Sequence, residues 1–191
     1  MVTDSVNLEN DEFGYSCYVI VAPAPSELTE PLLEIERAAG QERAKIPAHV
    51  TVKGTMYGVT SLDGLIDEIR KVTVRHNLIS LGTAGMALTN WTNDSVIMGF
   101  VVNPEIQALH DDLMSSIAPL GKSAYPDDPY KAHMSIVNQV GVEGAEIAKG
   151  LLTDIDFGDS LSFGVIDLMA RRGPGWGGTW HRLERFELSA G

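Results

Sequence analysis

Several features that define common protein classes are missing from this sequence. It has one cysteine, Cys17, so no intrachain disulfide can form, and we interpret this residue as a small core side chain in a reducing compartment. No run of eighteen or more apolar residues is present, and residues 1–12 are polar and acidic, unlike a secretory signal peptide. We therefore expect a cytoplasmic protein without a membrane-spanning segment.

Basic residues are also scarce. The chain has 14 Lys and Arg residues against 26 Asp and Glu residues, which gives a net charge of -12. Such a charge disfavours a protein that binds long stretches of nucleic acid by neutralising phosphates. A small anionic substrate or the end of an RNA, held in a locally positive pocket, agrees better with this composition. Lys45, Lys53, Lys122 and Lys131 are the candidates for such a pocket.

The sequence also lacks the patterns of common metal and triphosphate sites. No two of its five histidines lie within four positions of each other, and no P-loop is present. We therefore expect a site that uses no metal and no cofactor, and we do not expect an ATP-dependent ligase.

What the sequence does contain is one short pattern that occurs twice, as Ala48-His49-Val50-Thr51-Val52 and as Ala132-His133-Met134-Ser135-Ile136. The alternation predicts a strand in which the histidine and the hydroxyl residue share one face. If the two faces converge, they supply a general base, a general acid and two hydrogen-bond donors, which suffice for metal-free phosphodiester chemistry. The alternative is two half-buried strand histidines without a chemical role.

The two motifs lie in similar surroundings, which indicates a degenerate internal duplication. Each is preceded by a β-rich run and a helical pattern, at 15–22 and 26–39 in the first half and at 95–102 and 104–117 in the second. Ser26 and Asn103 are the expected N-caps. A helix and a strand are expected after each motif, at 62–72 and 78–91 and at 145–152 and 161–171.

A duplication of this kind predicts a pseudo-twofold axis. We expect it to place the motif strands on opposite walls of a central groove, with His49 and His133 across from each other. The closing strands at 161–172 and 179–188, joined by the Gly-rich segment 173–178, are expected to complete the second lobe.

Two H-x-[ST] motifs 84 positions apart, each after a strand–helix unit, resemble the two-histidine (2H) phosphoesterase superfamily, which includes 2'-5' RNA ligase-like proteins and cyclic nucleotide phosphodiesterases. The similarity in organisation runs from about Tyr15 to Leu188, and residues 180–188 are similar to that family's last strand. The resemblance implies an α+β, bilobal fold, with two pseudo-twofold-related lobes that each carry an antiparallel β-sheet and flanking helices around a central groove. We expect residues 1–12 to form a flexible N-terminal extension, residues 13–191 to form one domain, and the protein to be a monomer.

The resemblance also implies roles for the motif residues. His49 and His133 would be the acid–base pair of a metal-independent site, and Thr51 and Ser135 would hold the phosphoryl oxygens. The expected substrate is a cyclic (2',3'-cyclic or related) or 2'-5' phosphodiester of a nucleotide or RNA end. We assign His133 to the nucleophile and His49 to the leaving oxygen, although nothing in the sequence decides this order. The alternative is a non-catalytic nucleotide- or RNA-end-binding protein that keeps the groove.

Three further residues are candidates for substrate binding. By strand alternation Lys53 shares the face of His49 and Thr51, so it would contact the phosphate, although a solvated lysine at a strand end is an equal alternative. Tyr130 and Trp176 lie in loops and would stack on a base, unless they serve only in packing. For His76, His110 and His181 we expect structural or solvent-facing positions.

Overall fold

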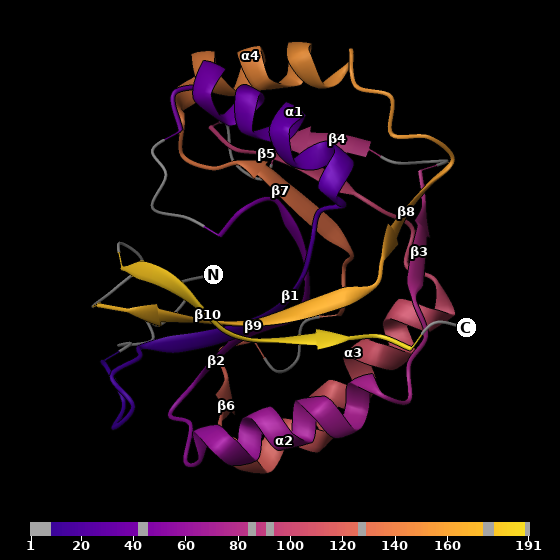
Figure 1. Cartoon of the computed structure of the whole chain (residues 1–191). Coiled ribbons are helices and arrows are strands. Elements are labelled where there is room, and N and C mark those ends of the chain that lie inside the picture. Colours follow the sequence, from indigo (N-terminus) through magenta and orange to yellow (C-terminus); the bar gives the residue numbers. More distant parts are fainter. Residues whose placement is uncertain are drawn as a thin grey trace.

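Both motif strands belong to one antiparallel sheet (Figure 1), whose strands run in the order β10-β9-β1-β2-β7-β5-β4, with β6 paired to β2. The structure is a computed structural model and describes residues 9–41, 46–83, 87–90, 94–125, 129–173 and 178–189. β2 (His49–Tyr57) carries the first motif, and its neighbour β7 (His133–Val137) carries the second. A second sheet contains only β3 and β8.

The remaining elements, in chain order, are β1 (Cys17–Pro23), α1 (Ser26–Ala38), α2 (Leu62–Thr73), β3 (Ile79–Gly82), β4 (Ala87–Asn90), β5 (Val96–Gly99), α3 (Pro104–Ile117), the 3-10 helix η1 (Ala118–Leu120), β6 (Lys122–Ser123), α4 (Gly141–Leu152), β8 (Ser160–Phe163), β9 (Val165–Arg172) and β10 (Thr179–Glu187). The expected strand at 78–91 is therefore two strands, β3 and β4, and the one at 161–171 is also two, β8 and β9. In both places the first strand joins the small sheet and the second joins the large one.

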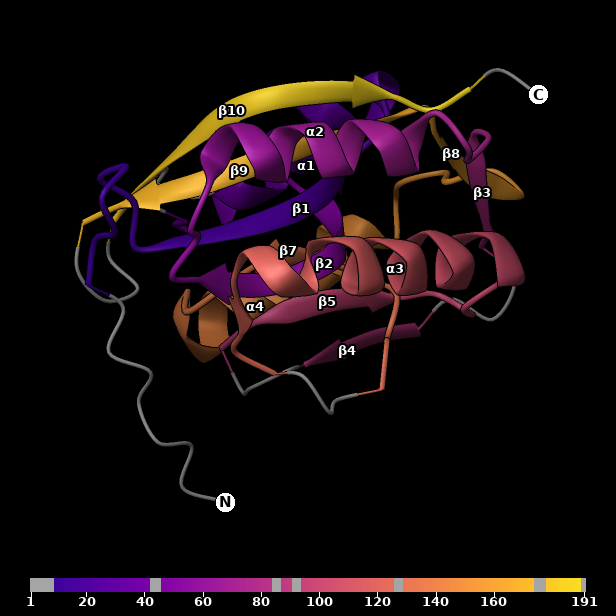
Figure 2. The same cartoon turned by 90° about the horizontal axis from the view of Figure 1, so that it is seen from below.

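Two pairs of helices cover the sheet and divide the molecule into two lobes (Figures 1 and 2). α2 packs on α3, and the pair contacts β10 and β2, whereas α1 packs on α4 against β7 and β5. The α+β fold with antiparallel sheets and flanking helices, predicted from the sequence, is confirmed. The pairing differs from simple duplication, because α1 from the first half covers strands of the second, and α3 from the second half covers β2.

Two expectations about the arrangement of strands are wrong. The motif strands do not stand on opposite walls, because β2 and β7 are neighbours that pair at Val50 and Met134. The closing strands do not complete the second lobe either. β9 pairs with β1 along Cys17–Val21, and β10 pairs with β9, so both extend the sheet of the first lobe. They occupy the edge of β1 that is opposite β2, which would otherwise expose unpaired backbone groups.

Local signals explain where the helices begin. The Asn103 side chain accepts a hydrogen bond of 3.0 Å from the backbone N–H of Ile106, with Pro104 as the first helical residue, as predicted. Ser26 is not the N-cap, because α1 begins at Ser26 itself and Pro25 occupies the cap position. The Ser26 hydroxyl instead donates to the Glu27 carboxylate.

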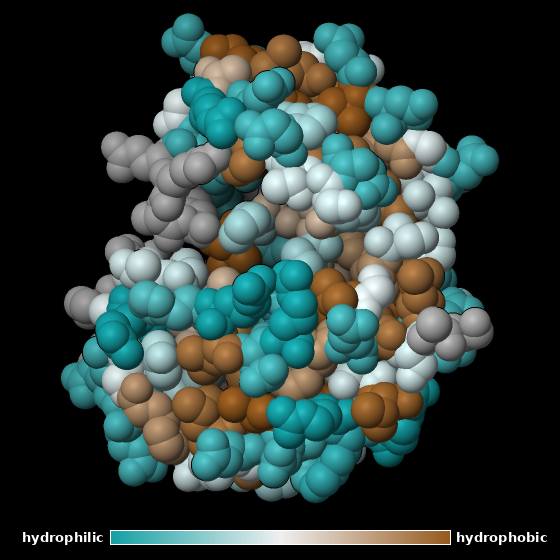
Figure 3. All heavy atoms as spheres, in the orientation of Figure 1, coloured by the Kyte–Doolittle hydropathy of each residue, from teal (hydrophilic) through white to brown (hydrophobic). Residues whose placement is uncertain are grey.

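Strand alternation gives the sheet of the first lobe two different faces. Tyr18, Ile20, Leu168 and Ala170 belong to the main core, which includes the buried stripes of the helices. The intervening side chains point to the other face, where Val19, Val21 and Met169 form a small apolar cluster with Ile46 and Trp180. This second face is called the open face below. On the side of the molecule shown in Figure 3, apolar and hydrophilic side chains are interspersed.

Residues 9–12 of the expected N-terminal extension are described, and two of them hold the chain to the first lobe. The Asp11 carboxylate accepts a hydrogen bond of 2.7 Å from the Tyr18 hydroxyl, and the Asn10 side chain accepts one from the backbone N–H of Gly173. Among the described residues, no helix has the length and apolar character needed to cross a membrane.

The N-cap of α3 gives a first prediction. Asn103→Ala removes the cap of α3 and a 2.7 Å hydrogen bond from the Asn103 amide to the Ser80 carbonyl, so it should lower the free energy of unfolding by about 1–2 kcal/mol. Ser26→Ala is the matched control, because it removes an exposed hydroxyl that caps nothing, and should change stability by less than about 0.5 kcal/mol. Urea unfolding measures both, and equal losses would contradict the assignment of caps.

Candidate active site

The antiparallel pairing of β2 with β7 brings the two motifs together. Val50 pairs with Met134, and both side chains are fully buried in the core. The register of this pair places His49 opposite Ser135 and Thr51 opposite His133, on the other face of the sheet. The two motifs are therefore arranged symmetrically about the Val50–Met134 pair. All four motif residues lie within one step of it.

Both imidazole rings are held by the same kind of hydrogen bond to the backbone. His49 Nδ1 lies 2.7 Å from the carbonyl oxygen of Pro47, and His133 Nδ1 lies 2.9 Å from that of Lys131. A carbonyl oxygen only accepts, so each Nδ1 donates, and Nε2 carries the lone pair of the neutral ring. Each histidine therefore presents Nε2 as the atom that takes up or releases a proton.

The pKa of His49 is well below the ordinary value for a histidine. Burial lowers its pKa from 6.5 to about 4, the hydrogen bond to Pro47 opposes this effect, and the charge of His133 lowers the pKa further. The influence of His133 agrees with the diagonal placement of the two rings. Near neutral pH, His49 is consequently an uncharged imidazole.

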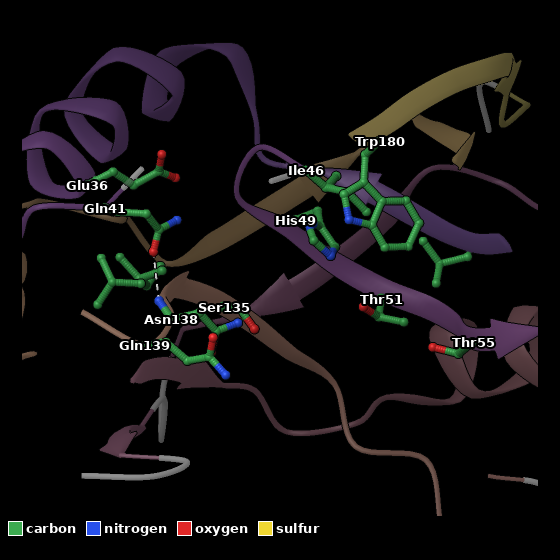
Figure 4. Close-up of a pocket in the computed structure, with 13 residues that line it drawn as sticks. Glu36, Gln41, Ile46, His49, Thr51, Thr55, Ser135, Asn138, Gln139 and Trp180 are labelled. Carbon is green, nitrogen blue, oxygen red and sulfur yellow. Dashed lines mark hydrogen bonds between the residues drawn. The ribbon is translucent and has the colours of Figure 1, made fainter. Parts of the chain in front are cut away.

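A cavity of about 300 Å³ lies over this part of the sheet (Figure 4). His49, Thr51 and Ser135 line its middle; Trp180 and Ile46 line one side, and Gln41, Asn138 and Gln139 line the other. Val19, which also lines the cavity, belongs to the same apolar cluster as Trp180 and Ile46. His133 is on the same sheet face but is not among the lining residues. The cavity therefore combines an apolar, aromatic side with a carboxamide side, and the first motif lies between them.

Hydrogen bonds from backbone N–H groups hold the residues on the carboxamide side of the cavity in place. The N–H of Asn138 donates to Gln41 Oε1 at 2.7 Å, so the Gln41 amide is left with its NH₂ group as donor toward a ligand. Gln139 directly follows and has a φ of 56°, a left-handed conformation that is uncommon for a residue other than glycine. Its backbone N–H donates to Ser95 Oγ at 3.1 Å. Strain of this kind is typical of binding sites.

The structure does not bring Lys53 into the cavity. Two register shifts interrupt the pairing of β1 with β2, one of them between Thr51 and Lys53, so simple alternation fails there. Lys53 is 4% exposed, its Nζ donates to the Gly54 carbonyl, and burial lowers its pKa to about 8. Thr55, which the sequence analysis did not single out, lines the cavity instead.

Tyr130 supports the first motif rather than the cavity. Its hydroxyl donates to the Thr51 carbonyl at 3.2 Å, and its ring stacks on that of His110 with centroids 4.3 Å apart. His110 in turn has Nδ1 2.7 Å from the Val52 carbonyl. These two side chains therefore fix the backbone of β2 beside Thr51. Trp176 and Lys45 lie outside the described residues.

The aromatic residue in the cavity is Trp180, which sequence reasoning missed. It belongs to the closing strand β10, and Arg171 lies beneath it, with the guanidinium carbon 5.6 Å from the ring centroid. Arg171 is fully buried and donates from Nε to Ser16 Oγ. The available signal was strand alternation, which places Trp180 and Arg182 on one face of β10. His181 is exposed between them.

The fold and the paired H-x-[ST] strands define the two-histidine phosphoesterase class. The chain belongs to the 2'-5' RNA ligase superfamily, whose family model matches residues 24–172. In the described part of the chain, no group of three His, Cys, Asp or Glu residues could hold a metal ion.

Several solved structures share this fold. Escherichia coli LigT complexed with 3'-AMP is 13% identical with a TM-score of 0.57, and the match covers 90% of this chain and 97% of that one. TT0787 of Thermus thermophilus is 14% identical with a TM-score of 0.63, covering 91% of this chain and 98% of that one. No curated protein matches the sequence.

The environment of His49 gives a second prediction. Its ring should stay neutral down to about pH 4, whereas an unperturbed histidine is half protonated near pH 6.5. Because an unfolded chain would take up that proton earlier, lowering the pH from 6.5 toward 4 should also destabilise the fold. NMR titration of the ring signals, assigned with His49→Gln, measures the pKa. A midpoint near 6.5 would contradict the prediction.

Proposed function

We propose that this protein is a metal-independent phosphoesterase that hydrolyses a cyclic (2',3'-cyclic or related) or 2'-5' phosphodiester of a nucleotide or RNA end. The observation that carries the proposal is the Val50–Met134 pair, which joins both histidines and both hydroxyls on one sheet face. Members of the superfamily are generally phosphoesterases. Two titratable imidazoles favour an enzyme over a binding protein, because binding needs only donors and cations.

Hydrolysis needs two proton transfers, which one histidine cannot perform at once. In the proposed step, water attacks phosphorus and loses a proton to His49 Nε2, while the bond to the leaving oxygen breaks and that oxygen takes a proton from His133 Nε2. The step leaves a phosphomonoester and a free hydroxyl, on one molecule for a cyclic substrate and on two for a 2'-5' linkage. This order reverses the one we assigned from the sequence, because burial keeps His49 neutral and therefore able to accept a proton.

Thr51 and Ser135 complete the proposed site. Each hydroxyl lines the cavity and lies opposite the other motif's histidine, so both can donate to the non-bridging phosphoryl oxygens. Such donors act most strongly as negative charge develops in the transition state. The step requires neither a metal nor a cofactor.

The rest of the cavity suits a nucleotide. Trp180 offers an aromatic face for a base, and the carboxamides of Gln41 and Gln139 offer donors and acceptors for polar groups. LigT, which shares the fold, has been crystallised with 3'-AMP and with ATP, which supports a nucleotide as the substrate.

The proposal predicts metal-free turnover that depends on both histidines. In EDTA, wild-type protein should hydrolyse a member of a panel of 2',3'-cyclic mononucleotides, ADP-ribose cyclic phosphate and a 2'-5' oligoadenylate. His49→Ala and His133→Ala should each lower kcat by roughly 10²-fold or more. His181→Ala, at an exposed histidine of β10, is the control and should retain activity. Binding without turnover, unaffected by both substitutions, would favour the binding-protein alternative.

The pH dependence should reveal which histidine is the base. If neutral His49 accepts the proton, kcat/KM should fall on the acid side as the pH drops through about 4. It should also fall on the alkaline side, because the step needs a protonated donor for the leaving oxygen. An acid limb near pH 6.5, or an alkaline limb that is absent up to about pH 9, would contradict this assignment.

A further inference from the structure

A second cavity adjoins the first and shares His49 with it. It has a volume of about 210 Å³ and lies over the open face, where its apolar lining includes Val21, Met169 and Pro47. Its polar lining consists of Asp167, Arg182 and Arg185 besides His49. Because Ile46 and His49 line both cavities, a ligand that fills both would pass directly beside the imidazole.

The two arginines of this cavity differ in how closely they contact the Asp167 carboxylate. Arg185 holds Asp167 in a two-pronged ion pair, with Nε and Nη2 each 2.7 Å from a carboxylate oxygen. Arg182 Nη1 lies 3.8 Å from Asp167 Oδ2, which is too long for a hydrogen bond, and its side chain is 54% exposed. One carboxylate therefore faces two guanidinium groups, and Arg182 is the one that it holds less closely. Glu187 lies two residues beyond Arg185, farther along β10.

The distance from Arg182 to the first cavity indicates how large a ligand could occupy both cavities. Arg182 lies two residues from Trp180 on β10, a distance of about 7 Å along a strand. It pairs with Met169, the apolar centre of the open face. A group seated on the open face would therefore be the direct neighbour of a nucleotide held between Trp180 and the histidines. Apolar floor and exposed guanidinium together suit a nucleoside with its phosphate.

We propose that Arg182 and the part of the open face around Val21 and Met169 form a subsite for a second, phosphate-bearing nucleotide of the substrate. The protein then acts on the end of an oligonucleotide of two or more nucleotides in preference to a mononucleotide. This inference rests on the proposed phosphoesterase function. A subsite with one exposed guanidinium also agrees with the net charge of -12, because it binds one flanking phosphate without attracting long nucleic acid.

The test compares one reactive end on two substrates, adenosine 2',3'-cyclic phosphate and the dinucleotide ApA with the same cyclic end. Arg182→Gln should lower kcat/KM for the dinucleotide about tenfold and leave that for the mononucleotide within about twofold. Arg182→Lys should recover part of the loss. Arg70→Gln is the matched control, because Arg70 is similarly exposed (53%) and forms an ion pair with Asp67 on α2, behind the sheet. Equal effects on both substrates, or no effect, would overturn the inference.

A binding measurement separates this inference from the proposed activity. If neither substrate nor any other member of the panel is hydrolysed, the phosphoesterase proposal fails, and calorimetry with the 3'-phosphates of adenosine and of ApA then tests the subsite by itself. Weaker binding of the dinucleotide alone in Arg182→Gln would support the subsite. Equal binding of the two ligands by wild-type protein would overturn it.

Discussion

The pairing of Val50 with Met134 is the contact on which the rest of the site depends. Among the residues that the structure describes, it is the register position that joins β2 to β7, and thereby the two lobes of the sheet. Both side chains are buried, so the pair is held by the core and cannot shift by one residue without turning the motif side chains inward. The placement of the four motif side chains on one sheet face therefore depends on the packing of two apolar side chains.

The pairing of β2 with β7 places the two motif histidines in nearly equivalent positions, although the two sides of the cavity around them differ. Each histidine is anchored through Nδ1 to the carbonyl two residues before it, so both rings leave Nε2 for proton transfer. Acid–base catalysis nevertheless needs two unequal partners. The lowered pKa of His49 favours it as the partner that accepts a proton, and the two sides of the cavity, aromatic at Trp180 and carboxamide at Gln139, give a substrate a preferred direction.

Much of this could be predicted from the sequence, where local pattern decides the structure. The duplicated motif, the cap at Asn103 and the buried stripe of α3 all follow from spacing along one segment. What failed depends on contacts between distant segments. The register shifts that bury Lys53 arise from pairing with β1, and the partner of the closing strands depends on which sheet edge is vacant. Trp180 was overlooked because its strand was interpreted only as a closing element.

The exchange of helices between the lobes also has a consequence for how the two halves of the chain fold. Each half of the chain supplies a helix that covers strands belonging to the other half, α1 over β7 and α3 over β2. A chain of half this length would leave an apolar sheet face uncovered, which folded proteins in water rarely tolerate. We therefore expect the two halves of the chain to fold together as one cooperative unit, and neither half to be stable by itself.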